Sequence, residues 1–458
     1  MSSSPVDPWE DPEGDDSQRG KSSSSEPSKP DSPDSGGQST PSTDPDNPFA
    51  ALLNGLDPQQ LGAALARLGQ LLSASDGPVN WELAQDAARQ VIAANADPAL
   101  AATEQESVQT AVRLAEHWLQ EATALPAGAI RVQAWNRAEW VAATMPVWRR
   151  IVEPIAERAG AAMGEFIATQ VGATPAPFLG IVHAMGGVAF GGQIGQALGW
   201  LASEVVSSTD IGLPVGPAGT AALLPANIDA LGQGLDVPDA EVRLYLALRE
   251  AAHHRLFRHV PWLGEHLIGV VHAYARGITI NPVRLEEVMR RIDPVDPAGV
   301  SEALSGGMFQ PDQTPEQHAA LVRLETMLAL VEGWVDAVVG SAATPRLPAT
   351  AALQETLRRR RAAGGPAEQT FATLVGLELR PRRLRDAARL WSLLAEARGT
   401  DGRDAVWGHP DLLPTTEDLD NPEEFVDRAG PTELDLSALD GEPNPEPPAG
   451  PATDEPGR

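Results

Sequence analysis

The residues best placed to do chemistry are a glutamate and two histidines in one short segment. Glu250, His253 and His254 lie within the sequence LREAAHHRLFRH, residues 248–259. On a helix, residues three and four apart are neighbours, so the three side chains project from adjoining faces. A carboxylate and imidazoles held together on an apolar helix have perturbed proton affinities, as active-site residues often do. The segment is therefore a candidate site, and the alternative interpretation is a partly exposed, charged helix face.

The same segment follows a metal-binding motif at all but one position. Arg249, Glu250 and His253 occupy the frame H-E-x-x-H, with arginine in place of the first histidine. Two histidines one helical turn apart bind zinc in that motif, and its glutamate acts as the general base. A guanidinium stays charged and cannot ligate zinc, so Arg249 is a departure that bears on the chemistry.

Several other segments accompany this motif along the chain. They are MPVW (145–148), LPAN (224–227), VPWL (260–263), YARGI (274–278), LSGG (304–307), VEGWVD (331–336) and WGHPDLLP (407–414). In these segments and in the motif frame, the chain resembles an actinobacterial zincin-like family. Members are described as zinc-dependent metalloproteases or as hydrolases, and a sister group is associated with deazaflavin-coenzyme biosynthesis.

The resemblance implies a zinc-dependent hydrolase that acts on peptide or amide bonds of a peptide or protein substrate. Carried over by position, Glu250 is the general base and His253 is a zinc ligand. Glu332 matches the downstream carboxylate ligand. Asp336 lies one turn later on the same helix face and is either a partner that orients a ligand or an alternative ligand.

Arg249 leaves three arrangements open. In the first, the site is metal-free and Arg249 forms an ion pair with Glu250 or Glu332. In the second, a shifted set of His253, His254 and Glu332 holds the metal. In the third, the fold is kept and the chemistry is lost, so the protein is a catalytically inactive binding or scaffold module whose groove near Glu250 holds a peptide or partner segment.

Composition excludes several other classes of protein. Among the 458 residues there is no cysteine, and lysine occurs only at Lys21 and Lys29. Thiol nucleophiles and iron–sulfur clusters are thus excluded, and the body of the chain has no lysine for a phosphate-binding loop or a Schiff base. The formal charge of −29 argues against nucleic-acid binding. Without cysteine or an apolar leader, a cytoplasmic protein is expected; the oligomeric state stays open.

A largely helical body must position the candidate residues. Residues 1–47 and 401–458 are acidic and rich in proline, which predicts a disordered first tail and a mostly disordered second one. The body, 48–400, is expected to be a mainly α, zincin-like metallopeptidase-type helical fold with few short strands, and 48–145 is a candidate helical subdomain. From the second tail, Val406, Trp407, Leu412 and Leu413 are candidates to pack on the body.

Apolar periodicity places helices and short strands along this body. Helices are expected from Asp57, from about 80 to 94, and at 104–122, 146–171, 239–258, 262–276, 315–340, 348–362 and 381–398. Short strands are expected at 129–135 and 277–280, with a long loop at 207–225. The arginine runs at 358–361 and 380–385 are interpreted as solvated faces or as docking surfaces for the acidic C-terminal tail.

The segment 166–203 has no charged residue and is long enough to be tested as a membrane helix. Gly187, Gly191, Gly195 and Gly199 recur at every fourth position and would line one helix face, where they permit close helix contact. Glutamines and prolines interrupt the stretch, which favours a packed core helix pair. Stable membrane insertion is not expected, and a membrane-peripheral role is the weaker alternative.

Overall fold

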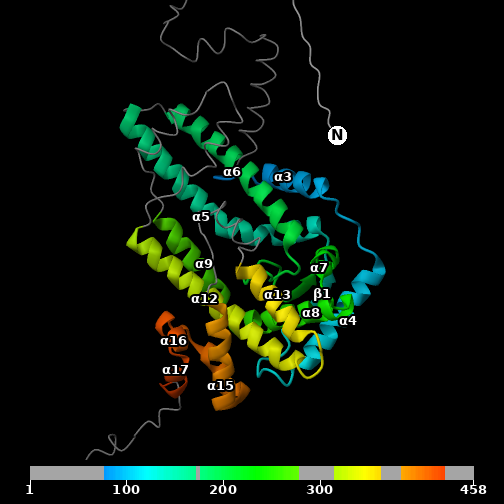
Figure 1. Ribbon diagram of the computed structural model, residues 1–458. Coiled ribbons are helices and arrows are strands. Elements are labelled where there is room, and N and C mark those ends of the chain that lie inside the picture. Colours follow the sequence, from blue (N-terminus) through cyan, green and yellow to red (C-terminus); the bar gives the residue numbers. More distant parts are fainter. Residues whose placement is uncertain (1–76, 172–175, 278–313, 363–382, 429–458) are drawn as a thin grey trace, which may run out of the picture. The chain divides into compact units, whose positions relative to one another are not determined.

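The mainly α fold expected from the sequence is confirmed in the computed structural model, in which helices surround one small sheet (Figure 1). The structure describes residues 77–171, 176–277, 314–362 and 383–428. All of them belong to the compact unit Leu65–Arg458. The predicted first tail, the helix expected from Asp57 and the last thirty or so residues of the predicted second tail lie outside the described residues.

The centre of the described fold is helix α8 (Asp239–His259), which carries the candidate motif. It packs against α4 (Ala102–Leu119), α12 (Pro315–Ala343) and strand β2 (Thr220–Leu223). A helix that is buried on all sides is ordinarily apolar throughout. This one instead brings a group of ionisable side chains into the interior, namely Arg249, Glu250, His253, His254 and Arg255.

The sheet consists of two short parallel strands beside α8. Strand β1 (Arg131–Ala134) lies within the predicted strand 129–135 and pairs with β2 in the register Arg131 to Thr220 through Ala134 to Leu223. The prediction of one long loop at 207–225 was wrong, because it contains β2. The TAAL sequence of β2 is buried at every position and so lacks the alternation that marks a half-buried strand.

Three helices form the part of the fold that contains the glycine-rich stretch. They are α3 (Trp81–Ala94), α5 (Arg137–Val171) and α6 (Ala176–Glu204). The glycine face of α6 packs on α3: a Cβ added at Gly191 or Gly195 would overlap the carbonyl oxygens of Asn80 and Ala84. The close contact predicted from the glycine spacing is therefore confirmed. The predicted start of α5 at 146 was wrong, since the helix begins at Arg137 and carries Pro146 inside it.

Helices α9 (Pro261–Arg276), α13 (Thr350–Ala362) and α15 (Leu384–Asp404) pack on α12, and α7 (Pro225–Gly232) packs on α8. Most predicted helices agree with the observed ones to within a few residues. Helices α12 and α15 approach closely at Gly333, where an added Cβ would lie 2.6 Å from Ala387. Gly399, with φ of 71°, bends α15 near its end.

The segment after α15 packs onto the helices before it. It forms two short 3₁₀ turns, Ala405–Gly408 and Pro410–Leu412, followed by α16 (Thr416–Asp420) and α17 (Pro422–Arg428). Trp407 is buried and stacks on Trp391 with ring centroids 5.2 Å apart. The predicted boundary between body and second tail, at residue 400, thus falls inside α15.

One described helix, α12, is long and apolar enough to be tested as a membrane span. Its apolar window is 78% buried within the protein, which is the pattern of a core helix. The uncharged stretch that raised the question in the sequence does not meet the same criterion over its described residues.

Candidate functional site

Helix α8 carries two pairs of ionisable residues, and the two members of each pair are one helical turn apart. Arg249 and His253 face Glu332 on α12, at 2.5 Å and 3.1 Å respectively. Glu250 and His254 form the other pair and contact each other, Nε2 to Oε1 3.1 Å. Residues i and i+4 lie on the same helix face, which explains both pairs. Because the second pair is one residue further along the helix, it faces a different direction from the first.

The carboxylate of Glu250 is fully buried and fully hydrogen-bonded. Oε1 accepts from the Ser208 hydroxyl at 2.5 Å and the Ala222 amide at 2.9 Å, besides His254. Oε2 accepts from both the hydroxyl and the amide of Thr209, at 2.5 Å and 3.3 Å. These donors come from the segment before β2 and from β2 itself, which is how the small sheet positions the motif glutamate.

Hydrogen bonding dominates the acidity of Glu250. Burial alone would raise its pKa, but the hydrogen bond and charge of His254 and the hydroxyls of Ser208 and Thr209 outweigh that effect and lower the pKa to about 2. A carboxylate with so low a pKa is a weak base at neutral pH. In this arrangement Glu250 is better suited to holding the strand and helix together than to accepting a proton.

The carboxylate of Glu332 is surrounded by positive groups. Arg249 Nη2 lies 2.5 Å from Oε2, and Arg361 Nη1 lies 2.6 Å from Oε1. His253 Nε2 lies 3.1 Å from the same Oε1. The Glu332 side chain is 1% exposed, so these charges interact in the protein interior. Both oxygens of the expected downstream ligand are therefore occupied by partners from the chain itself.

The attraction between these opposite charges lowers the pKa of Glu332 and raises the pKa of Arg249. Burial would raise the pKa of Glu332, but Arg361, His253 and Arg249 together hold it far below its usual range. Burial would lower the pKa of Arg249, but Glu332 and further neighbours raise it. His253 Nδ1 faces the Arg249 carbonyl at 2.9 Å while Nε2 faces Glu332. Both ring nitrogens of His253 therefore face acceptor oxygens.

The arginine run on α13 closes the cluster, which corrects the interpretation of 358–361 as a solvated face or docking surface. Three of its members reach interior carboxylates: Arg358 to Asp336 at 2.5 Å, Arg360 to Asp210 at 3.1 Å and Arg361 to Glu332. Arg359 follows the prediction, since its side chain is 77% exposed. Asp336 also lies 3.8 Å from Arg249, so it belongs to the same network.

The geometry does not fit a catalytic zinc ion, which needs three protein ligands. His253 Nε2 has no lone pair to offer while it donates to Glu332, and two guanidinium groups occupy the Glu332 carboxylate. His254 is directed to Glu250 rather than to Glu332. Over the described ranges no three His, Asp or Glu side chains converge, so the shifted set of His253, His254 and Glu332 is not assembled.

The structure brings together four of the six residues singled out from the sequence: Arg249, His253, Glu332 and Asp336. The ion pair between Arg249 and Glu332, one of the open alternatives, is formed. Sequence reasoning missed the partners of Glu250 and the role of Arg361. The Ser-Ser-Thr run 207–209 was assigned to a loop, and its hydroxyls gave no signal of a buried carboxylate partner.

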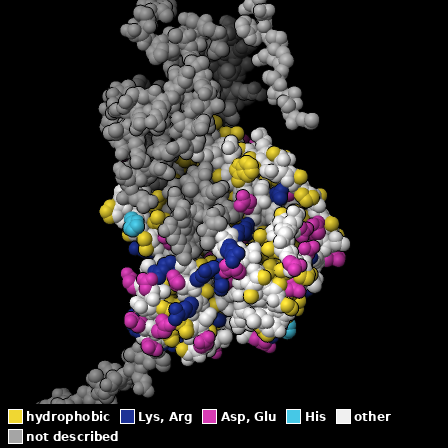
Figure 2. Space-filling view, in the orientation of Figure 1, with side chains coloured by type: hydrophobic (Ala, Val, Ile, Leu, Met, Phe, Trp, Pro, Cys, Tyr) yellow, Lys and Arg dark blue, Asp and Glu magenta, His cyan; other side chains and the backbone are white. Residues whose placement is uncertain are grey.

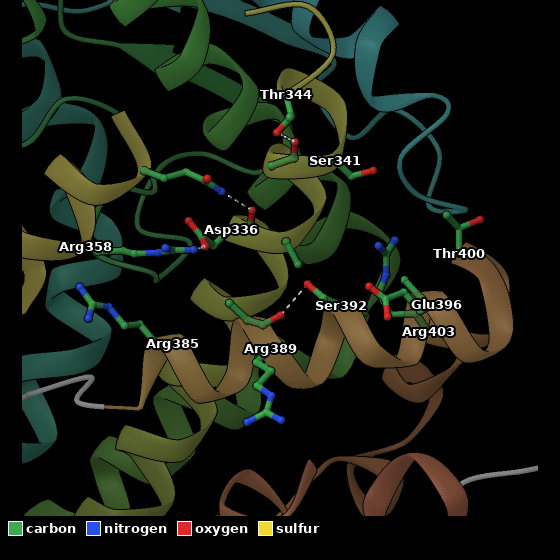
Figure 3. Close-up of a pocket in the computed structure, with 15 residues that line it drawn as sticks. Asp336, Ser341, Thr344, Arg358, Arg385, Arg389, Ser392, Glu396, Thr400 and Arg403 are labelled. Carbon is green, nitrogen blue, oxygen red and sulfur yellow. Dashed lines mark hydrogen bonds and ion pairs between the residues drawn. The ribbon is translucent and has the colours of Figure 1, made fainter. Parts of the chain in front are cut away.

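A groove near Glu250 was expected for the binding alternative. Glu250 is 0% exposed, so its carboxylate faces no groove within the described structure. A pocket lies instead on the far side of Asp336, between α12, α13 and α15 (Figure 3).

Comparisons with known proteins agree with this architecture. A sequence profile of the family described as zincin-like metallopeptidase matches residues 79–426. A crystal structure from Chloroflexus aurantiacus, described as a candidate hydrolase with a novel fold, is similar with a TM-score of 0.53 and 22% identity. The similarity covers 76% of this chain and 98% of the other, and shows a shared fold. Among the curated proteins there is no match.

Proposed function

The chain belongs to the zincin-like metallopeptidase family, and we propose that it serves as a binding or scaffold protein. In this proposal arginine side chains occupy the place of the metal ion. One observation carries this proposal: both oxygens of Glu332 are paired with guanidinium groups, from Arg249 and Arg361. A guanidinium supplies the compensating positive charge but no Lewis acidity.

The state of Glu250 supports the same proposal. Its two oxygens accept five hydrogen bonds, and its pKa is lowered to about 2. A general base must reach the proton that it removes and must have a pKa near the working pH. Glu250 meets neither condition in the described arrangement, so its role is to join α8 to the segment 208–222.

The partner class in this proposal is a protein or peptide, and the expected location is the cytoplasm. The motif helix, held by ion pairs, is then a rigid element in the centre of the fold. Nucleic acid is disfavoured by the formal charge of −29.

The metal content of the protein tests this proposal. The protein is purified without a metal-binding tag, incubated with zinc and analysed beside the His253→Ala and Glu332→Ala variants. We expect no stoichiometric zinc in any of the three. Near-stoichiometric zinc that falls in both variants would overturn the proposal. A partner whose binding survives chelator treatment would add to its support.

Hydrolysis of peptide or amide bonds is the second candidate, because the family is one of metallopeptidases. The orientation of His253 favours it: Nδ1 donates to a backbone carbonyl, as in many ligand histidines, and Nε2 points at the candidate ligand Glu332. In this candidate Glu250 is the base. A hydrolytic activity that disappears in Glu250→Gln, measured on a peptide substrate panel, would favour it over the binding proposal.

A further inference from the structure

The pocket between α12, α13 and α15 has the size and polarity of a ligand site. Its volume is about 590 Å³, within the range of small-molecule pockets, about 300–1,000 Å³. Helices α12 and α15 touch at Gly333 and Ala387, and the pocket is lined by the residues that follow on each helix. The pocket is thus a consequence of how the two helices cross.

The walls of this pocket are polar and carry more positive than negative charge. Four arginines and two acidic residues line it, together with serines, threonines and a glutamine, and its other lining residues are only alanine and glycine. The wall thus offers guanidinium, hydroxyl and amide groups to a ligand. It therefore suits a ligand that makes many hydrogen bonds and carries negative charge.

Arg358 retains hydrogen-bonding capacity toward such a ligand. Its Nη2 donates to Asp336 at 2.5 Å, whereas its Nε is buried without a hydrogen-bond partner among the described residues. Buried donors are nearly always paired in native proteins, so an unpaired one needs an explanation. Figure 3 shows Arg358 reaching from α13 across to Asp336 on α12, at one side of the pocket.

Arg385 provides a second guanidinium near Arg358. Its Nη2 contacts both carboxylate oxygens of Glu355, at 3.2 Å and 3.1 Å, and its side chain is 66% exposed. Arg358 and Arg385 both line the pocket, Arg358 from α13 and Arg385 from α15. An exposed ion pair such as that of Arg385 with Glu355 is weak, so a ligand oxyanion can replace Glu355. Figure 2 shows basic side chains gathered where α13 and α15 lie.

The opposite part of the pocket carries groups that match ligand hydroxyls. Ser341 and Thr344 lie on α12, and Ser392, Glu396 and Thr400 lie on α15 (Figure 3). A carboxylate accepts hydrogen bonds from hydroxyl groups. The hydroxyls of Thr344 and Ser392 donate to the backbone carbonyls of Gly340 and Ala388, and their oxygens can still accept. This hydroxyl side of the pocket also carries Arg389 and Arg403.

We propose that this pocket binds a small polyhydroxylated molecule that carries an oxyanion, either a sugar phosphate or a sugar acid. The oxyanion contacts Arg358 and Arg385, and the hydroxyl groups contact the serine, threonine and Glu396 side. This site goes beyond the proposed function and does not depend on it. Its test measures neither zinc nor hydrolysis, so the two proposals can fail separately.

Isothermal titration calorimetry of the full chain tests the site with four probes: glucose 6-phosphate, gluconate, glucose and inorganic phosphate. We expect glucose 6-phosphate or gluconate to bind more tightly than glucose and inorganic phosphate, and the tighter of the two identifies the oxyanion. Failure of both to bind at millimolar concentration would overturn the proposal. Equal affinity for glucose 6-phosphate and inorganic phosphate would overturn the role of the hydroxyl side.

Substitutions of pocket arginines test whether the measured binding takes place in this pocket. Arg385→Gln is expected to weaken binding about tenfold, the effect of losing one charge-assisted hydrogen bond. Because Arg385 is exposed, this variant should fold normally, whereas Arg358→Gln also removes a partner of buried Asp336. Arg89→Gln is the control: Arg89 is 63% exposed, pairs on the surface with Asp86 and does not line the pocket. Equal weakening in Arg385→Gln and Arg89→Gln would contradict the assignment.

Discussion

Arg249 and Glu332 form a buried ion pair, with Nη2 2.5 Å from Oε2. Arg249 stands at the first histidine of the H-E-x-x-H frame, and Glu332 is the residue expected from the sequence at the downstream carboxylate position. A lone buried pair is a poor source of stability, because both charges lose their hydration. Here Arg361 and His253 add further donors to the same carboxylate. The Glu332 carboxylate thus has three partners from the chain itself, Arg249, Arg361 and His253.

Removal of the central carboxylate should destabilise the protein strongly. In Glu332→Gln the guanidinium groups of Arg249 and Arg361 lose their closest counter-charge, and the next carboxylates, Asp336 and Asp210, are each 3.8 Å away. Breaking a buried pair in this way costs about 3–5 kcal/mol. Urea unfolding followed by circular dichroism measures the loss.

The matched control is Glu265→Gln. Glu265 pairs with Arg150 on the surface, where both side chains are more than half exposed. Such a pair contributes about 0–1 kcal/mol, so the variant should unfold close to the wild type. If Glu332→Gln is as stable as Glu265→Gln, the ion-pair network does not stabilise the fold.

Glu250 predicts a loss of stability in acid. Its folded pKa, about 2, lies below the ordinary value of 4.5, so the unfolded state binds the proton more readily. The stability that this group contributes is therefore complete above pH 4.5 and decreases as the pH falls toward 2. Urea unfolding of wild type and Glu250→Gln between these limits measures the effect.

The comparison isolates Glu250 from the other carboxylates. Glu332 also has a lowered pKa and loses its contribution in acid, but it does so in both proteins. We expect the difference in unfolding free energy between wild type and Glu250→Gln to shrink as the pH falls. A difference that stays constant across the range would contradict the assignment of low pKa to Glu250.

The helices could be predicted from the sequence because their signals are local. The predictions of helices at about 80–94, 239–258 and 262–276 each depend on a few neighbouring residues, and the structure has helices at those places. Strand β2 could not be predicted in the same way. It is four residues long and buried throughout, and its partners are distant in sequence: β1, the Glu250 carboxylate and the segment 206–208.

The residues of the candidate site also differ in whether a local pattern or a long-range contact identifies them. The motif frame marks Arg249, Glu250 and His253 by local spacing alone. The contact of Arg361 with Glu332 joins α13 to α12, and no pattern in the run 358–361 distinguishes a buried arginine from exposed Arg359. Long-range ion pairs are set by tertiary packing, which is why the run was misinterpreted as a surface.

On α6, replacing Gly195 by alanine should cause a steric clash, whereas replacing Gly192 should not. In Gly195→Ala the new methyl group would overlap the carbonyl oxygen of Ala84 on α3. Overpacking of this kind costs about 1–3 kcal/mol. Gly192→Ala is the control, since nothing lies within 4 Å of its added Cβ. There alanine should stabilise the helix by up to about 1 kcal/mol. Thermal unfolding of the two variants would reveal equal shifts if the face were not tightly packed.

The proposal that arginine occupies the place of a metal ligand can be tested by restoring histidine at position 249. Arg249→His restores the H-E-x-x-H frame, but Arg361 would still bind Glu332. We therefore expect little zinc in the single variant and near-stoichiometric zinc once Arg361→Ala is added, because two imidazoles and a carboxylate then make three ligands. Elemental analysis after zinc incubation measures both. Arg359→Ala with Arg249→His is the control, since Arg359 lies on the same helix but is exposed. Equal zinc in the two double variants would show that Arg361 does not compete with a metal.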